Sequence, residues 1–151
     1  MPKSQPLNTA TSHQEDIIFY QWDERLSVGI PSIDRQHKVL ISLINELHVS
    51  MEDGRGKFQA KHVLKKIIHF ARSHFIYEES LFKRVHYLET DEHIQSHQRI
   101  TSTLVELKAD SGNPDFDLPD TLMTFLKHWL NQHILIEDMG YSKLLISHKM
   151  R

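Results

Sequence analysis

Residues 90–109 read TDEHIQSHQRITSTLVELKA, and this stretch decides the class of fold. Its apolar and histidine side chains recur in steps of three and four, the spacing that keeps residues on one face of an α-helix. The stripe consists of His93, His97, Ile100, Leu104 and Leu107. We therefore expect a helix over about 90–109 whose buried edge is partly histidine, and we expect Thr90 to be its N-cap.

The same spacing predicts three further helices on either side of this stretch. They cover about 32–51, 58–85 and, with Pro119 in its first turn, about 117–146. Turn signals separate them, DGRG at 53–56 and SGNP at 111–114. Because short connections join neighbouring antiparallel helices, we expect an all-α, up-down-up-down antiparallel four-helix bundle.

The N-terminal part of the chain differs from the helical part. Residues 1–17 are rich in polar residues and proline, which predicts a flexible arm, and residues 18–31 should pack as an extended arm across the bundle. We expect one domain over 18–151. The N-terminus lacks an apolar run that could form a signal sequence or a membrane span, so we expect a cytoplasmic protein without membrane insertion.

Composition limits the chemistry that this chain can perform. The 151 residues include 18 Lys+Arg, 20 Asp+Glu and no cysteine, but 12 histidines. A net charge of -2 gives no reason to expect a nucleic acid partner. The lack of cysteine excludes disulfides, thiolate zinc sites, Cys-ligated iron–sulfur clusters and cysteine nucleophiles. Any metal must therefore be bound by nitrogen and oxygen atoms.

Five histidines occupy the predicted buried faces of the four helices. They are His37, His74, His93, His97 and His133. A single histidine on an apolar face is more often a core residue bonded to a backbone carbonyl. Five in one small core would leave buried nitrogens unpaired unless they share a partner, and a metal centre supplies one.

Two pairs with helical spacing support this interpretation. His93 and His97 lie one turn apart on one face, as do His74 and Glu78, and the carboxylate of Glu78 could bridge two ions. The chain contains neither E-x-x-H nor H-E-x-x-H. The first absence argues against a ferritin-like di-iron scaffold and the second against a zincin protease.

The sequence resembles the hemerythrin family, and within it the single-domain bacteriohemerythrins. The matching segments occur in the family's order between residues 18 and 141. They are Trp22 with Val28-Gly29, IDRQH at 33–37, HFIYEE at 74–79, HIQSH at 93–97 and WLNQHILIED at 129–138. The full set of spaced ligands is far more specific than any one segment.

The resemblance implies a non-haem di-iron centre bridged by Glu78, Asp138 and a solvent-derived oxo or hydroxo group. One iron would be bound by His93, His97 and His133 and be saturated. The other would be bound by His37 and His74, leaving an open position for dioxygen. The implied function is reversible dioxygen binding by an oxygen carrier, storage or delivery protein, not an enzyme. The resemblance also implies that Tyr141 reaches a bridging carboxylate.

Geometry and resemblance disagree at the fourth helix. An i+4 partner of His133 is Glu137, whereas Asp138 at i+5 points about 140° away on an ideal helix. The family pattern selects Asp138, which requires an approach from the side or a local widening such as a π-bulge.

Other functions and partners stay open at this stage. An oxygen or redox sensor would need a partner protein, because we expect no room for a signalling module after the fourth helix. A di-iron oxidase or nitric oxide-handling enzyme would need a proton donor beside the open position. An oxygen-consuming client protein is a candidate partner, and the sequence does not determine the oligomeric state. The other seven histidines should have ordinary, mostly exposed positions.

Overall fold

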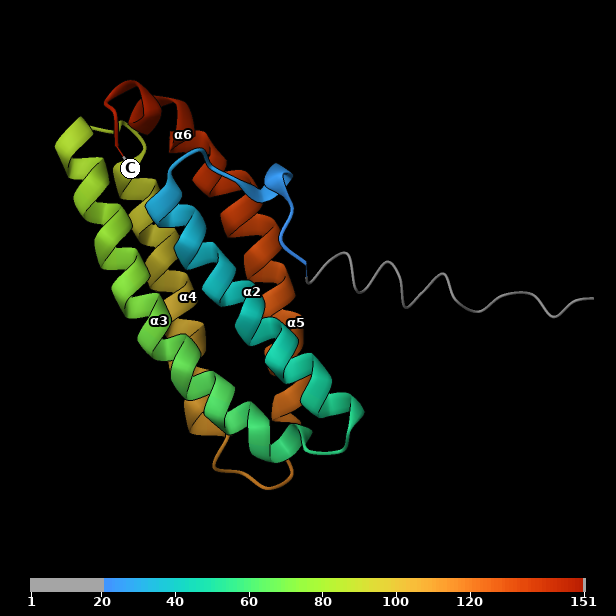
Figure 1. Ribbon diagram of the computed structural model, residues 1–151. Helices are drawn as coiled ribbons and strands as arrows, with labels where there is room; N and C mark the ends of the chain where they lie inside the picture. The colour runs from blue at the N-terminus through green and yellow to red at the C-terminus, as the bar shows by residue number, and fades with distance from the viewer. Residues whose placement is uncertain (1–20, 151) are drawn as a thin grey trace, which may run out of the picture.

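The protein is an elongated bundle of helices, seen in a computed structural model that describes residues 21–150 (Figure 1). The described part of the chain contains no β-strand. Its long helices are α2 (Pro31–Glu52), α3 (Gly56–Val85), α4 (Thr90–Asp110), α5 (Leu118–Trp129) and α6 (Asp138–Ser147), with a π-helix, η2 (Leu130–Glu137), between the last two.

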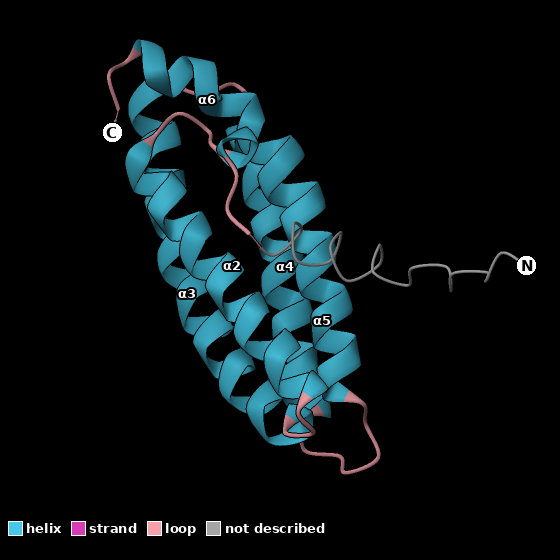
Figure 2. Cartoon of the chain, turned by 45° about the vertical axis from the view of Figure 1, so that its right-hand side comes forward, coloured by secondary structure: helices cyan, strands magenta, loops and turns pink. Residues whose placement is uncertain are grey.

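Four long rods make up the bundle, because α5, η2 and α6 follow one another without a break. Helix α2 packs against α3 and α5, and α4 packs against the same two helices. The connections over 53–55, 86–89 and 111–117 are short, so consecutive rods run in opposite directions (Figure 2). The predicted up-down-up-down bundle is confirmed.

Local sequence signals account for the start of α5 but not for the start of α4. Asp117 accepts a hydrogen bond from the backbone N–H of Asp120, and a proline occupies the first turn of α5, as predicted. The prediction that Thr90 is an N-cap was wrong. Glu89 is the N-cap, and the Thr90 hydroxyl donates to the carbonyl of Tyr87, so this side chain stabilises the preceding turn instead.

Two apolar clusters fill the bundle, one toward each end. The larger includes Leu40 to Leu47 on α2 and Leu118 to Trp129 on α5. The smaller includes Ile33 on α2 and Tyr141 on α6. Every rod also buries at least one histidine or acidic side chain, which places a polar layer inside an apolar bundle.

The segment before α2 crosses the end of the bundle at which α2 begins. It contains a short 3-10 helix, Glu24–Leu26. Val28 and Ile30 are buried in the smaller cluster, and Asp34 accepts hydrogen bonds from the Ser27 hydroxyl and the Val28 N–H. The predicted arm over 1–17 and its boundary with residue 18 lie outside the described residues. No described helix combines the length and apolarity that crossing a bilayer requires.

Candidate metal centre

Seven polar side chains form the buried layer between the apolar clusters. None is more than 5% exposed, although all could carry a charge. They are His37, His74, Glu78, His93, His97, His133 and Asp138. All seven were named as candidate metal ligands from the sequence, and all four rods of the bundle contribute to the layer.

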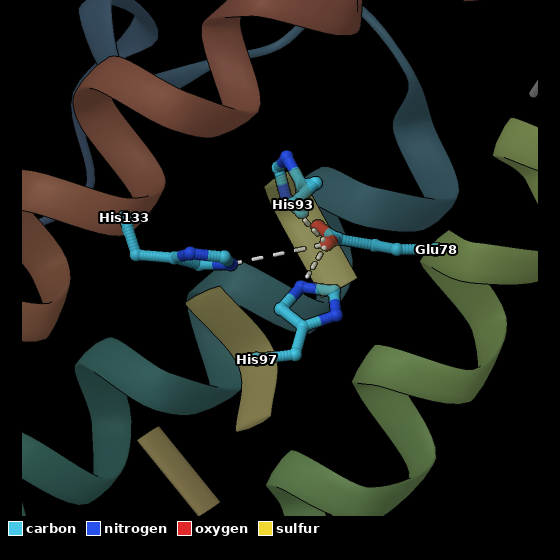
Figure 3. Close-up of side chains that lie close together, drawn as sticks. All are labelled: Glu78, His93, His97 and His133. Atoms are coloured by element: carbon cyan, nitrogen blue, oxygen red, sulfur yellow. Dashed lines mark hydrogen bonds and ion pairs between the residues drawn. The ribbon is translucent and has the colours of Figure 1, made fainter. Parts of the chain in front are cut away.

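The seven residues form two overlapping groups. In each group, one nitrogen or oxygen atom per residue lies within 4.8 Å of the others. One group combines Glu78 with the three histidines of α4 and η2, and Figure 3 shows their rings converging on its carboxylate. The other combines Glu78 with His37, His74 and Asp138. The arrangement has the form of two adjacent cation sites.

Glu78 belongs to both groups, and its carboxylate lies between two halves of the layer. One half holds His93, His97 and His133, and the other holds His37 and His74. Glu78 Oε1 is 3.1 Å from His74 Nε2 and 4.0 Å from His37 Nε2. Its Oε2 is 3.3 Å from His93 Nε2 and 3.1 Å from His97 Nε2. Each oxygen therefore faces one half of the layer, the disposition that a bridging ligand requires.

The two carboxylate oxygens of Asp138 also face different halves of the layer. Its Oδ2 lies 3.0 Å from His37 Nε2, whereas its Oδ1 lies 2.9 Å from His93 Nε2 and 3.2 Å from His133 Nε2. Two carboxylates and five imidazoles thus surround one polar interior.

The outer nitrogens of two histidines are bonded to carboxylates. His97 Nδ1 lies 2.8 Å from Glu79 Oε1 and His133 Nδ1 lies 2.8 Å from Glu137 Oε2. Because an ionised carboxylate only accepts hydrogen bonds, each Nδ1 carries the proton and each Nε2 presents a lone pair to the interior. This is the tautomer that a metal-binding histidine needs.

Several inward-facing atoms have no hydrogen-bond partner among the described residues. They include the Nε2 atoms of His74, His93 and His133 and Oδ1 of Asp138. Buried polar atoms without partners are costly, and native proteins rarely keep them. These nitrogen and oxygen atoms lie close together but are not aligned for hydrogen bonds with each other. Such an arrangement is expected of atoms that bind one cation together. The donor set of imidazole and carboxylate suits iron and other first-row metals.

Burial and mutual repulsion shape the ionisation of the layer. Burial raises the pKa of Asp138 well above its ordinary value, and the neighbouring negative charge of Glu78 raises it further. Burial opposes ionisation of Glu78 as well. The surrounding histidines, of which His74 has the largest effect, nevertheless hold the pKa of Glu78 well below its ordinary value. Burial lowers the pKa of His133 to about 4. Cations would relieve the repulsion between the two carboxylates.

The π-helix explains how Asp138 enters the layer. The backbone N–H of Asp138 donates to the carbonyl of His133, an i+5 hydrogen bond that puts these two residues one wide turn apart. Asp138 is fully buried as a result. Glu137 lies at the edge, where it bonds the outer nitrogen of His133 and accepts from the Ser96 hydroxyl at 2.6 Å. The helical spacing was correct that Glu137 contacts His133, but the contact is on the outward side of the ring.

Aromatic rings and a phenol hold the inner residues in position. Phe75 stacks on His97 with ring centroids 3.9 Å apart, and Phe70 stacks on His74 at 5.2 Å. The Tyr141 hydroxyl donates to Glu78 Oε1 at 2.8 Å, as the resemblance implied.

Sequence reasoning did not identify the outer partners Gln36, Glu79 and Ser96. Gln36 bonds His74 and Glu79 bonds His97, each on another helix, so no local pattern indicated these two contacts. The remaining described histidines lie outside both of the groups that could hold a cation. Five are exposed, and His48 is half-buried beside Glu52 at 3.3 Å. His13 lies outside the described residues.

Comparisons with known proteins agree with this geometry. The family model described as "Hemerythrin HHE cation binding domain" matches residues 28–145. A bacteriohemerythrin of Stenotrophomonas maltophilia is 30% identical over 129 residues, covering 84% of this chain and 82% of that protein. One of Pseudomonas aeruginosa is 31% identical over 124 residues, covering 80% and 77%.

The fold also matches a solved structure. A crystal structure of hemerythrin, a leucine-to-tyrosine variant, superimposes with a TM-score of 0.74 at 21% sequence identity. The match covers 83% of this chain and 95% of the solved one. At this level of identity the likeness concerns the fold, and it agrees with the four-helix bundle described above.

Proposed function

Because this chain belongs to the hemerythrin family, we propose that it binds dioxygen reversibly at two iron ions held by the buried polar layer. The observation that carries the proposal is the placement of Glu78 and Asp138, each of which turns one oxygen to each half of the layer. In this proposal Glu78 and Asp138 would each hold both ions, together with an oxo or hydroxo group from solvent. The family membership and the seven buried residues support it together.

The five histidines divide unequally between the two halves. His93, His97 and His133 would bind one ion, and His37 and His74 would bind the other. The half with two imidazoles has one ligand fewer, which leaves room for dioxygen. An iron pair held there would supply the electrons for reversible dioxygen binding. Tyr141 keeps Glu78 in place through its hydrogen bond.

Apolar side chains surround the layer and keep water away from it. Trp129, Ile134 and Leu40 are at most 1% exposed, and Leu104 is buried as well. Exclusion of water limits the entry of protons and reductants, which convert reversible binding into oxidation. This environment suits a carrier, storage or delivery protein more than an enzyme that turns oxygen over.

The function is tested by reduction of the iron-loaded protein without oxygen, followed by exposure to air. We expect about two iron ions per chain and a visible absorption band that appears with oxygen and disappears on deoxygenation. The His74→Ala or His93→Ala variant should lack the band, because each removes a ligand. Irreversible oxidation at the first exposure would instead favour sensing or turnover. A band that persists in both variants would refute the ligand assignment.

Metal binding should also depend on pH in a defined direction. Burial lowers the pKa of His93, but contacts with Asp138 and Glu78 outweigh this and raise it to about 9. A metal ion must therefore displace a proton at pH 7, and the competition weakens as pH rises. We expect Zn²⁺ uptake at pH 7 to release about one proton, with affinity rising about tenfold per pH unit toward pH 9. Calorimetry in buffers of different ionisation enthalpy measures the release, and a flat pH profile would contradict it.

A further inference from the structure

The two halves of the layer differ in what bonds to the outer nitrogens of their histidines. In the half with three histidines, His97 and His133 each face a carboxylate, Glu79 and Glu137, at 2.8 Å. In the other half, His74 Nδ1 faces the neutral side-chain oxygen of Gln36 at 2.5 Å.

The other histidine of that half lacks an outer partner. His37 Nδ1 is buried and has no hydrogen-bond partner among the described residues. The carboxylate of Asp34, one turn earlier on α2, accepts hydrogen bonds from Ser27 and Val28 and not from His37. The half with two histidines therefore has no carboxylate bonded to an imidazole from outside.

Glu79 and Glu137 lie where they can hold a negative charge at low cost. Their side chains are 25% and 27% exposed, so water solvates part of each carboxylate. Each lines a separate surface groove beside its histidine, of about 510 Å³ for Glu79 and about 470 Å³ for Glu137. Glu137 faces His133 Nδ1 at 2.8 Å and accepts a hydrogen bond from the Ser96 hydroxyl at 2.6 Å, and such contacts favour the ionised carboxylate.

A carboxylate bonded to the outer nitrogen strengthens a histidine ligand in two ways. It fixes the ring in the tautomer that offers Nε2, and it makes that nitrogen more basic. An amide oxygen fixes the ring but adds no charge. Each half also has one histidine stacked on a phenylalanine, His97 on Phe75 and His74 on Phe70. Aromatic stacking therefore does not distinguish the two halves, whereas the outer hydrogen-bond acceptors do.

We propose that Glu79 and Glu137 are positioning residues that make the three-histidine position the tighter metal site, while Gln36 keeps the two-histidine position weaker. This inference rests on the proposed two-metal centre and adds the order in which its positions fill. The first ion enters beside His97 and His133, and the second enters beside His37 and His74. A weaker second position has a more labile ligand sphere, which suits the position that must exchange a small ligand.

The test uses Co²⁺ titration of the metal-free chain in competition with a chelator, followed by proton NMR. We expect Glu79→Gln and Glu137→Gln each to weaken the first ion about 10- to 100-fold and the second much less. Gln36→Glu should tighten the second ion about tenfold. The exposed Glu106→Gln variant on α4 removes the same charge away from the layer and should leave both constants unchanged.

The NMR signals separate positioning from mere structure. Cobalt shifts the Nδ1 protons of its histidine ligands far outside the normal range, and each variant should displace the signal of its own histidine only. Equal weakening of both ions, or no change relative to Glu106→Gln, would overturn the inference while leaving the two-metal centre intact. Failure of the unmodified chain to take up two Co²⁺ ions would refute the proposed function, and the inference with it.

Discussion

Asp138→Ala is expected to reduce bound iron from about two ions per chain to about one or fewer. The carboxylate is fully buried and turns Oδ2 to His37 and Oδ1 to His93 and His133. Its loss removes a ligand from each proposed position and the negative charge that offsets two dications. Metal analysis after gel filtration measures the loss, and circular dichroism checks that the bundle remains helical.

Glu137→Ala is the matched comparison, because it removes the adjacent carboxylate, on the last residue of the π-helix. Among the described residues, Glu137 bonds the outer nitrogen of His133 and the Ser96 hydroxyl and no inward-facing atom. Its removal should weaken binding about 10- to 100-fold yet retain both ions when iron is in excess. Greater iron loss in Glu137→Ala than in Asp138→Ala would overturn the ligand assignment in favour of the simple i+4 spacing.

Removal of metal should lower the melting temperature by roughly 10 °C. The metal-free layer keeps two carboxylates close together and several buried nitrogens without partners. An ion that binds only the folded chain stabilises it by about 4 kcal/mol when its free concentration is 1,000 times Kd. For a domain of this size, each kcal/mol is worth about 2–4 °C. Differential scanning calorimetry of chelated and Zn²⁺-loaded protein measures the shift.

The His74→Ala/His93→Ala double variant is the control for this experiment. It removes one imidazole from each half and leaves both apolar clusters in place. Added Zn²⁺ should raise its melting temperature by only a small fraction of the shift in the unmodified chain. An equal shift in both proteins would show that the metal acts at another place, and no shift in either would contradict a metal centre in the layer.

Sequence reasoning anticipated most of the fold because its signals are local. The stripe from His93 to Leu107 predicted α4 to within a residue of its observed end at Asp110. The breaks at 53–56 and 111–114 lie at the observed connections. The cap of α4 was misassigned to Thr90, since the Thr90 hydroxyl donates to the Tyr87 carbonyl in the preceding turn.

By itself, the sequence determined four amphipathic helices, their antiparallel order and the histidines on their buried faces, since hydrophobic period and turn residues act over a few positions. Only the tertiary structure shows that Asp138 lies in the buried layer and Glu137 at its edge. Helical spacing assumes a regular α-helix, whereas packing in the bundle accommodates a π-turn that carries Asp138 inward. The pairing of His74 with Gln36 and of His97 with Glu79 likewise joins different helices. Such contacts depend on how helices pack against one another, which the period of any one helix does not specify.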